Sequence, residues 1–175
     1  MTQNTLAHTS TTNTIPISVC LIAKNEEKHV KNCLEPLKEL GFEIIVTDTG
    51  STDKTVELAK EYTPNIFHFS WCDNFSAARN YCIDKATRPY ILVIDFDEYL
   101  SNIHIPSLLK AAEQTGIGMV TLNNHQNTDS GESIMTERIG RFFSKEKYCY
   151  KGRIHEQLTP KNNDVPSYYS VPVIL

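Results

Sequence analysis

Tyr90-Ile-Leu-Val-Ile-Asp-Phe-Asp-Glu98 joins the most hydrophobic run of the 175-residue chain to a cluster of carboxylates. The apolar residues before Asp95 predict a buried strand of a parallel sheet. Asp95 and Asp97 are two positions apart, so at the end of an extended strand their side chains point the same way. Two neighbouring carboxylates repel each other unless a cation lies between them, and Mg²⁺ or Mn²⁺, which prefer oxygen ligands, would suit. The alternative is a solvated acidic turn that caps the next helix.

Apolar strand-like runs alternate with amphipathic helical stretches on both sides of this segment. Predicted strands cover residues 17–23, 43–48, 66–69, 90–95 and 118–122, and predicted helices open at Lys24, follow the turn 50–53, carry Phe75 to Ala86 and cover 105–115. The first of these helices would have acidic residues in its first turn and would end at Gly41. Strands that alternate with helices form a mostly parallel sheet with right-handed crossovers. The sequence therefore predicts an α/β fold with helices flanking a mostly parallel sheet.

The pattern changes after Asn123, where a small β-rich segment begins. Residues 124–133 are predicted as a polar loop and 134–150 as two β-prone segments. We expect residues 1–14 to be a flexible tail, 15–122 the α/β core, and 123–175 the start of an acceptor-side segment. The chain ends on the apolar run 171–175, and a native chain seldom ends on an unburied strand-like run, so we expect this segment to be truncated.

Composition and charge exclude several classes of protein. The net charge of −4 and the pI near 5.9 argue against a nucleic-acid-binding surface. No run approaches the roughly 18–20 apolar residues of a membrane-spanning helix, and the Thr- and Asn-rich start is no signal peptide. The five cysteines are odd in number and lack C-x-x-C spacing, which favours reduced thiols and a cytoplasmic location.

Polar residues follow several of the predicted strands. In an open parallel sheet, ligands bind outside the carboxyl ends of the strands. Lys24-Asn25-Glu26 follows the first strand, Asp48 ends the second, and Asp95 ends the most hydrophobic one. Asp48 either caps the Gly-Ser-Thr-Asp turn or accepts hydrogen bonds from the imide N–H of a nucleobase such as uracil. These strand ends are therefore the candidate binding site.

Two further segments carry residues with a structural and a functional interpretation. Arg79 lies beside a buried helical face, where it either extends to water or binds a diphosphate. Trp71 is predicted to be core. His155 and Glu156 follow a glycine, and His155 is either a structural residue or a nitrogen ligand of a metal. Glu156 would then lie near an acceptor as a base.

Four segments together resemble family 2 glycosyltransferases of the GT-A fold. They are Ile17-Ser-Val-Cys-Leu-Ile-Ala-Lys-Asn-Glu-Glu27, Ile44-Ile-Val-Thr-Asp-Thr-Gly-Ser-Thr-Asp-Lys-Thr55, Phe75-Ser-Ala-Ala-Arg-Asn80 and Ile91-Leu-Val-Ile-Asp-Phe-Asp-Glu98. Each is weak alone, but their order is specific and covers roughly residues 15–158. Phe69 to Asn80 and Gly152-Arg-Ile-His-Glu156 look most like a bacterial branch that includes peptide S-glycosyltransferases and enzymes with tetratricopeptide repeats.

The resemblance implies a Rossmann-like fold, a nucleotide-sugar donor that is usually UDP-linked, and inversion at the anomeric carbon. It also implies Mn²⁺ or Mg²⁺ held chiefly by Asp97, with Asp95 near the ribose and metal. The donor-binding residues it implies are Ala23, Asn25, Glu26, Asp48, Arg79 and Asp95, with Asp48 on uracil and Arg79 near the diphosphate. The predicted metal ligands are Asp97, Asp95 and His155, and the predicted base is Glu156. The acceptor, a peptide, protein or glycan, is not identified by the sequence.

Two positions depart from the pattern of the family. The common Asp-Asp after the second strand is Asp48-Thr49 here, and Phe96 replaces a small residue inside D-x-D. A sugar-phosphate nucleotidyltransferase is the nearest rival, but it would need a Gly-rich basic loop where this chain has residues 23–26. The other alternative is a non-catalytic nucleotide-sugar-binding or partner-recruiting domain.

Overall fold

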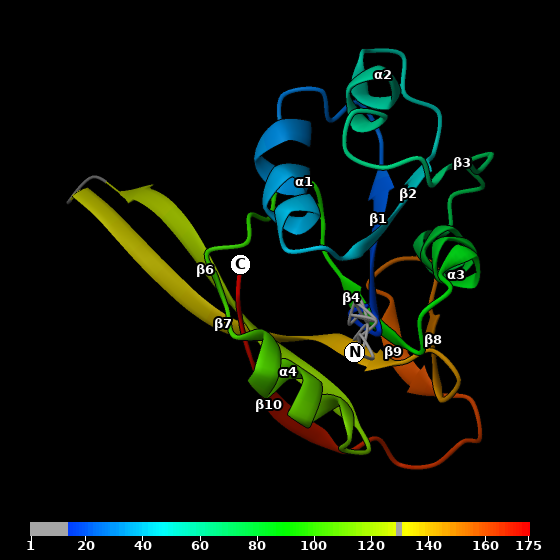
Figure 1. Ribbon diagram of the computed structural model, residues 1–175, viewed down its shortest axis with the longest axis vertical. Helices are drawn as coiled ribbons and strands as arrows, with labels where there is room; N and C mark the ends of the chain where they lie inside the picture. The colour runs from blue at the N-terminus through cyan, green and yellow to red at the C-terminus, as the bar shows by residue number, and fades with distance from the viewer. Residues whose placement is uncertain (1–13, 129–130) are drawn as a thin grey trace, which may run out of the picture.

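The computed structural model describes residues 14–128 and 131–175, so the predicted tail lies outside the described residues except for Thr14. One eight-stranded sheet runs through the molecule, and a two-stranded ribbon lies beside it. Figure 1 shows the helices on both faces of the sheet and a β-hairpin arm that projects from the body. The elements are β1 (Ile17–Ala23), α1 (Val30–Glu39), β2 (Glu43–Asp48), α2 (Thr55–Ala59), β3 (Ile66–His68), α3 (Phe75–Lys85), β4 (Tyr90–Val93), β5 (Asn102–Ile103), α4 (Ile105–Ala112), β6 (Ile117–Thr128), β7 (Gly131–Ser144), β8 (Tyr148–Lys151), β9 (Gln157–Pro160) and β10 (Tyr168–Ile174).

The strand order of the large sheet is β3-β2-β1-β4-β7-β6-β10-β5. The pairs β3–β2, β2–β1, β1–β4 and β6–β10 are parallel, whereas β4–β7, β7–β6 and β10–β5 are antiparallel. This arrangement confirms the predicted α/β class with a mostly parallel sheet and a β-rich C-terminal segment. The parallel pairs of β1 bring the carboxyl ends of β1, β2 and β4 to one edge.

Alternate residues of each strand pack against opposite layers. Val19 and Leu21 of β1 face the layer that contains α1, α2 and α4, and Cys20 faces α3 and the β8–β9 ribbon. Residues of a strand point to alternate faces, so the apolar runs of β1 and β4 fill both layers. The core therefore consists of two clusters, one on the α1 face of the sheet and one on the α3 face.

The first helix begins later than the sequence predicts. Residues 24–29 form turns, and α1 begins at Val30 without an acidic residue in its first turn. Asn25 has a φ of 58°, in the left-handed region, so it cannot belong to a right-handed helix. The predicted end at Gly41 is confirmed: its φ is 80°, and the N–H of Phe42 donates to the carbonyl of Leu37, as in a Schellman motif.

Residues 124–133 are predicted as a polar loop, but the described residues among them, 124–128 and 131–133, belong to the strands β6 and β7 of the hairpin arm. Asn124 pairs with Met135 and Asn123 with Thr136. The Thr136 hydroxyl donates to Asn123 Oδ1 at 2.9 Å, and Asn124 Nδ2 donates to Glu137 Oε1 at 2.8 Å. Polar side chains bonded across the ladder stabilise two strands where hydrophobic periodicity gives no signal.

The apolar run 171–175 is buried, whereas the sequence analysis treated it as an unburied run. It lies in and just after β10, which inserts between β6 and β5, and Val171, Val173 and Leu175 are in the core. The strand β6 also continues through the predicted boundary between residues 122 and 123. The C-terminal segment therefore shares the sheet of the α/β core.

Candidate active site

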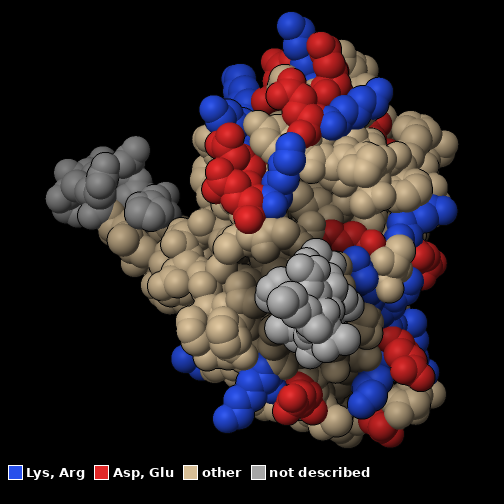
Figure 2. Space-filling view, in the orientation of Figure 1, with Lys and Arg blue, Asp and Glu red and all other residues tan. Residues whose placement is uncertain are grey.

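A pocket of about 350 Å³ opens at the carboxyl ends of the parallel strands. It is lined by Ile22, Ala23, Lys24, Glu26, Thr49, Trp71, Phe75, Arg79, Asp95, Phe96 and Asp97. This is the edge where the strand-end rule predicts a ligand. On the face seen in Figure 2, acidic and basic side chains are interspersed and do not gather into a broad basic surface. No helix within residues 14–128 and 131–175 is long and apolar enough to cross a membrane.

Asp95 and Asp97 lie in a turn and not on an extended strand. Strand β4 ends at Val93, and the N–H of Glu98 donates to the carbonyl of Asp95 at 3.0 Å, which closes the turn. Phe96 is buried inside the turn, whereas Asp97 is exposed at the pocket. Residues of a turn do not follow the alternation of a strand, so the two carboxylates have different surroundings.

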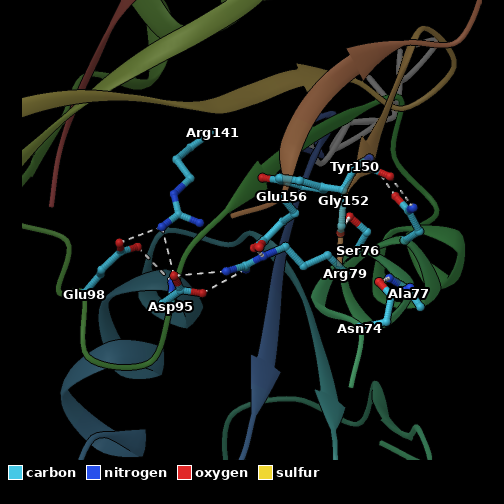
Figure 3. A network of polar contacts seen from close by, with 11 residues as sticks. Asn74, Ser76, Ala77, Arg79, Asp95, Glu98, Arg141, Tyr150, Gly152 and Glu156 are labelled. Atoms are coloured by element: carbon cyan, nitrogen blue, oxygen red, sulfur yellow. Dashed lines mark hydrogen bonds and ion pairs between the residues drawn. The ribbon is translucent and has the colours of Figure 1, made fainter. Parts of the chain in front are cut away.

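The carboxylate of Asp95 is bound by two arginines (Figure 3). Arg79 donates from Nη1 to Oδ1 at 2.9 Å and from Nη2 to Oδ2 at 3.2 Å, and Arg141 donates from Nη2 to Oδ2 at 2.9 Å. Burial acts to raise the pKa of Asp95, but the charges of Arg141 and Arg79 outweigh it and hold that pKa below its usual value. Asp95 is therefore an ionised partner of two guanidinium groups.

Arg79 neither extends to water nor points a free guanidinium at the pocket. It is 7% exposed, and its Nε donates to Glu156 Oε1 at 2.6 Å while Nη1 and Nη2 bind Asp95. Burial alone would lower the pKa of Arg79, but the two carboxylates outweigh burial and raise that pKa above its usual value. All three of its nitrogen atoms are engaged by carboxylates, although its side chain still lines the pocket.

The segment with His155 and Glu156 folds back toward the carboxyl ends of the strands, as a role for Glu156 there requires. The N-terminal part of α3 holds it: Ser76 Oγ donates to the carbonyl of Gly152 at 2.5 Å, and the N–H of Phe75 donates to the carbonyl of Arg153 at 3.0 Å. Glu156 therefore reaches Arg79 through a loop anchored on α3 (Figure 3).

His155 lies apart from the two aspartates in this arrangement. It is exposed, with a φ of 56°, and it lines a second pocket of about 390 Å³ together with Glu156, Arg141 and Tyr150. The described ranges contain no group of three His, Cys, Asp or Glu side chains placed to hold a metal ion. His155 is thus not brought together with Asp97 and Asp95.

Asp48 and Asn25 order the loops that border the pocket, but neither lines it. Asp48 accepts hydrogen bonds from the N–H groups of Gly50 and Ser51, each at 3.0 Å. Burial acts to raise the pKa of Asp48, but these hydrogen bonds outweigh it and lower that pKa. Asn25 Oδ1 accepts from the N–H of Thr52 at 2.7 Å, which ties the loop after β1 to the loop after β2.

Ala23 and Glu26 line the pocket, as predicted donor-binding residues should. The backbone N–H of Glu26 donates to Thr55 Oγ1 at 2.6 Å, and burial raises the pKa of its carboxyl, with Asp97 adding to the effect. Lys24, which follows Ala23, donates from its ammonium group to the carbonyl of Gly50 at the rim. The lining of the pocket therefore includes one lysine as well as the carboxylates of Glu26, Asp95 and Asp97.

The exposed carboxylate of Asp97 could bind a divalent cation, whereas the neighbouring Asp95 is already paired with arginines. Mg²⁺ is usually held by one or two carboxylates together with water and substrate phosphates. Asp97 is exposed at the pocket, whereas both oxygens of Asp95 already accept hydrogen bonds from arginines. The residues present fit a cation bound by Asp97 and completed by phosphate and water oxygens.

Two residues near the site, Trp71 and Arg141, were not predicted from the sequence. Trp71, predicted as core, is 41% exposed, packs edge-to-face on Phe75 at 4.9 Å between ring centroids, and lines the pocket. Its indole N–H donates to Asp73 Oδ1. This local bond is typical of a residue in the loop before a helix and not of a core residue. Arg141 was also missed, although a charged residue between Gly140 and Phe142-Phe143 in a strand signals a buried partner.

Sequence comparison relates most of the chain to known proteins. The sequence profile described as Glycosyl transferase family 2 matches residues 18–168. The SPbeta prophage-derived glycosyltransferase SunS of Bacillus subtilis is 32% identical over 174 residues, which cover 97% of this chain and 41% of SunS. A TPR repeat-containing protein of Synechococcus elongatus is 44% identical over 84 residues, 48% of this chain and 21% of that protein. The chain thus spans less than half the length of either relative.

Two solved structures share the fold. The S. aureus TarS fragment 1–349 in complex with UDP aligns with a TM-score of 0.50 and 22% identity, over 59% of this chain and 34% of that chain. The mannosyltransferase PcManGT from Pyrobaculum calidifontis, in complex with GDP-Man and Mn²⁺, aligns with a TM-score of 0.50 and 18% identity, over 60% and 34%. At such identities the likeness shows the α/β architecture alone.

Proposed function

We propose that this chain, which belongs to glycosyl transferase family 2, forms the donor-binding part of an enzyme that moves a sugar from a nucleotide-sugar to an acceptor. The pocket at the carboxyl ends of β1, β2 and β4 carries the proposal, because it combines an exposed carboxylate, a lysine and an aromatic wall. We take the donor to be UDP-linked. The TarS fragment, which shares the fold, was solved in complex with UDP, and this supports the choice. A cytoplasmic location stays a prediction.

The donor diphosphate is placed between Asp97 and Lys24. Both side chains line the pocket, one from the turn after β4 and the other from the loop after β1. An Mn²⁺ or Mg²⁺ ion held by Asp97 would supply Lewis-acid stabilisation of the charge that develops on the leaving diphosphate. Lys24 adds a positive charge on the opposite side, and Trp71 with Phe75 covers apolar parts of the donor.

Glu156 remains the proposed base for an inverting displacement. It lines the second pocket, and Arg79, which binds it, lines both pockets. An acceptor hydroxyl or thiol in the second pocket would give its proton to Glu156 while it attacks the anomeric carbon from the side opposite the diphosphate. Within the described residues only Oε1 of Glu156 has a hydrogen-bond donor, so Oε2 is available to the acceptor.

The other proposed roles receive unequal support from the geometry. Asp48 binds Gly50 and Ser51 with its carboxylate, so a hydrogen bond to uracil would add to a cap that already exists. Arg79 is paired with carboxylates, which favours a structural role over direct contact with the diphosphate. His155, exposed in the second pocket, is better placed for an acceptor than for a cation at Asp97.

Binding of UDP with and without a divalent cation tests the proposal. We expect UDP at a hundred times its dissociation constant to stabilise the protein by about 2.7 kcal/mol in Mn²⁺, with little effect in EDTA. Equal melting temperatures with and without UDP in both buffers would contradict donor binding.

Donor binding without sugar transfer is the second candidate. The ion pair of Glu156 with Arg79 favours it, because a paired carboxylate can serve structure alone. Release of UDP from a UDP-sugar upon addition of Mn²⁺, lost in Glu156→Gln, would decide for catalysis. UDP binding without any release from a panel of UDP-sugars would decide for the binding role.

A further inference from the structure

Arg141 is a buried cation that the proposed function leaves without a task. It lies on β7, is 7% exposed, and precedes Phe142, which pairs with Leu92 of β4. A single atom of its guanidinium, Nη2, donates to Asp95 Oδ2 at 2.9 Å and to Glu98 Oε1 at 2.8 Å. One nitrogen from a different strand therefore bridges two carboxylates.

The two carboxylates that Arg141 bridges are the ends of the turn that carries Asp97. The N–H of Glu98 donates to the carbonyl of Asp95, and the N–H of Asp95 donates to Glu98 Oε2 at 2.9 Å. Phe96 is buried, so the turn is fixed on its inner side, and Asp97 is its exposed residue. Arg141 thus holds both ends of the turn at once (Figure 3).

The conformation of the turn 95–98 depends on Arg141 because carboxylates outnumber guanidinium groups around it. Asp95, Glu98 and Glu156 are three carboxylates that share two guanidinium groups, those of Arg79 and Arg141. Among the described residues, Glu98 forms its salt bridge with Arg141, whereas Arg79 forms its salt bridges with Asp95 and Glu156. Without Arg141, Glu98 would lose its guanidinium partner and Asp95 would keep only Arg79, so the repulsion between the two partly buried carboxylates would increase and favour opening of the turn.

We propose that Arg141 is a positioning residue that holds the turn 95–98 in the geometry from which Asp97 binds the cation of the donor complex. This inference rests on the proposed function, since it assigns Asp97 to a cation that accompanies UDP. Residues that orient a metal ligand without touching the metal typically change its affinity about 10–100-fold when they are replaced.

The geometry separates Arg141 from Arg79 in a way that lysine can reveal. Arg141 uses one nitrogen for both carboxylates, and the ammonium group of lysine, a compact charge with three donors, can make the same bridge. Arg79 uses Nε, Nη1 and Nη2 for two carboxylates on different segments, which one ammonium group cannot reproduce. Lysine should therefore function at position 141 and fail at position 79.

The test compares Arg141→Met, Arg141→Lys and Arg79→Lys, with Arg138→Met as the matched control on the exposed part of β7. Calorimetry would give the affinity for UDP in Mn²⁺ and in EDTA, and electron paramagnetic resonance would count bound Mn²⁺. We expect Arg141→Met to lose about 10–100-fold of the affinity in Mn²⁺ and none in EDTA. Arg141→Lys should stay within about threefold of the wild type, Arg138→Met should match it, and Arg79→Lys should not recover.

A double variant keeps the test decisive if Arg141→Met does not fold. Glu98→Gln combined with Arg141→Met removes the carboxylate that would be left without its cation, and it should fold yet bind Mn²⁺ and UDP as weakly as expected for Arg141→Met. Wild-type affinity in either methionine variant would overturn the inference, as would an Arg141→Lys variant no better than methionine. Failure of the wild-type protein itself to bind UDP more tightly in Mn²⁺ would overturn the proposed function, and the inference with it.

Discussion

In one half of the sheet, β3, β2, β1 and β4 are all parallel, whereas in the half formed by β7, β6, β10 and β5 only the pair β6–β10 is parallel. The parallel half supplies the pocket through its strand ends, which bring residues such as Ala23 and Asp95 to one edge. The other half supplies Arg141, near the C-terminal end of β7, and its side chain binds Asp95 at that edge.

The difference shows two ways in which a fold can place charge. The parallel half places carboxylates by backbone geometry, because the ends of parallel strands coincide. The other half supplies Arg141, and the loop between β8 and β9 supplies Glu156; both join the ion network around Arg79 and Asp95. Arg79 belongs to α3 and connects the two contributions. If the two halves fold as one cooperative unit, a substitution in either half should destabilise both.

The largest effect is expected from Phe142→Ala, which breaks the packing between the halves. Phe142 is fully buried, pairs with Leu92 of β4, and stacks on Tyr90 with 6.0 Å between ring centroids. We expect a loss of about 3–5 kcal/mol in the free energy of unfolding, measured in urea, within a single transition. Ile134→Ala, at a position 60% exposed on the same strand, is the control and should change stability by less than about 0.5 kcal/mol. Two separate transitions would show that the halves unfold independently.

The second largest effect is expected from Arg79→Met. We expect it to lower the free energy of unfolding by about 3 kcal/mol, because it leaves partly buried carboxylates with fewer partners. Glu156 would lose its ion-pair partner, and Asp95 would keep only Arg141. A double-mutant cycle with Glu156→Gln measures the coupling in urea. We expect Glu156→Gln to destabilise the wild type more than it destabilises Arg79→Met. Additive effects would mean that the contact contributes nothing to stability.

Asp97→Asn should affect binding and leave the fold intact, because Asp97 is exposed. The affinity for UDP in Mn²⁺ should fall about ten- to a hundredfold, or roughly 1.4–2.8 kcal/mol, while the affinity in EDTA stays constant. Asp84→Asn, on the exposed side of α3, is the control for removal of one surface charge. A large drop in melting temperature without ligand would instead make Asp97 a structural residue of the turn.

The smallest expected effect concerns Asp48, which belongs to the parallel half alone. Its pKa is lowered in the folded state, so its contribution is present above the unfolded value of about 3.9 and is lost as the pH falls through the lower folded value. We expect Asp48→Asn to lose about 1–2 kcal/mol at pH 7. The difference from wild type, measured in urea, should shrink as the pH falls below about 3.9. A difference that does not change with pH would mean that the charge of Asp48 is irrelevant to its cap.

The parts of the molecule that depend on local pattern could be predicted from the sequence. The strand Glu43–Asp48 has the predicted bounds, because a continuous apolar run ends at a capping residue. The resemblance of the four motifs to family 2 glycosyltransferases is confirmed by the family profile over residues 18–168. A position of Glu156 near the strand ends could also be inferred, from the Gly-Arg-Ile-His-Glu segment and from the lack of another unassigned acid–base pair.

What escaped prediction depends on contacts distant in the sequence. Arg141 meets Asp95 because β7 lies antiparallel to β4, and periodicity does not reveal which strands are neighbours. The separate surroundings of Asp95 and Asp97 follow from a turn closed by a hydrogen bond, where the sequence suggested an extended end. Residues 134–150 were predicted as β-prone, but the strand residues 124–128 and 131–133 of the hairpin arm were missed because their polar sequence has no apolar alternation.

The position of β10 has a consequence for synthesis on the ribosome. Among the strands that the structure describes, β5 is hydrogen-bonded to β10 alone, with Ile103 opposite Val173. A nascent chain that has emerged only as far as β9 therefore cannot pair β5, and it leaves both β5 and the adjoining side of β6 as open edges. Such edges attract other strands, and distant pairings form slowly. We therefore expect translational pausing just before β10 to raise aggregation of the nascent chain, and chaperones that cover strand edges to relieve it.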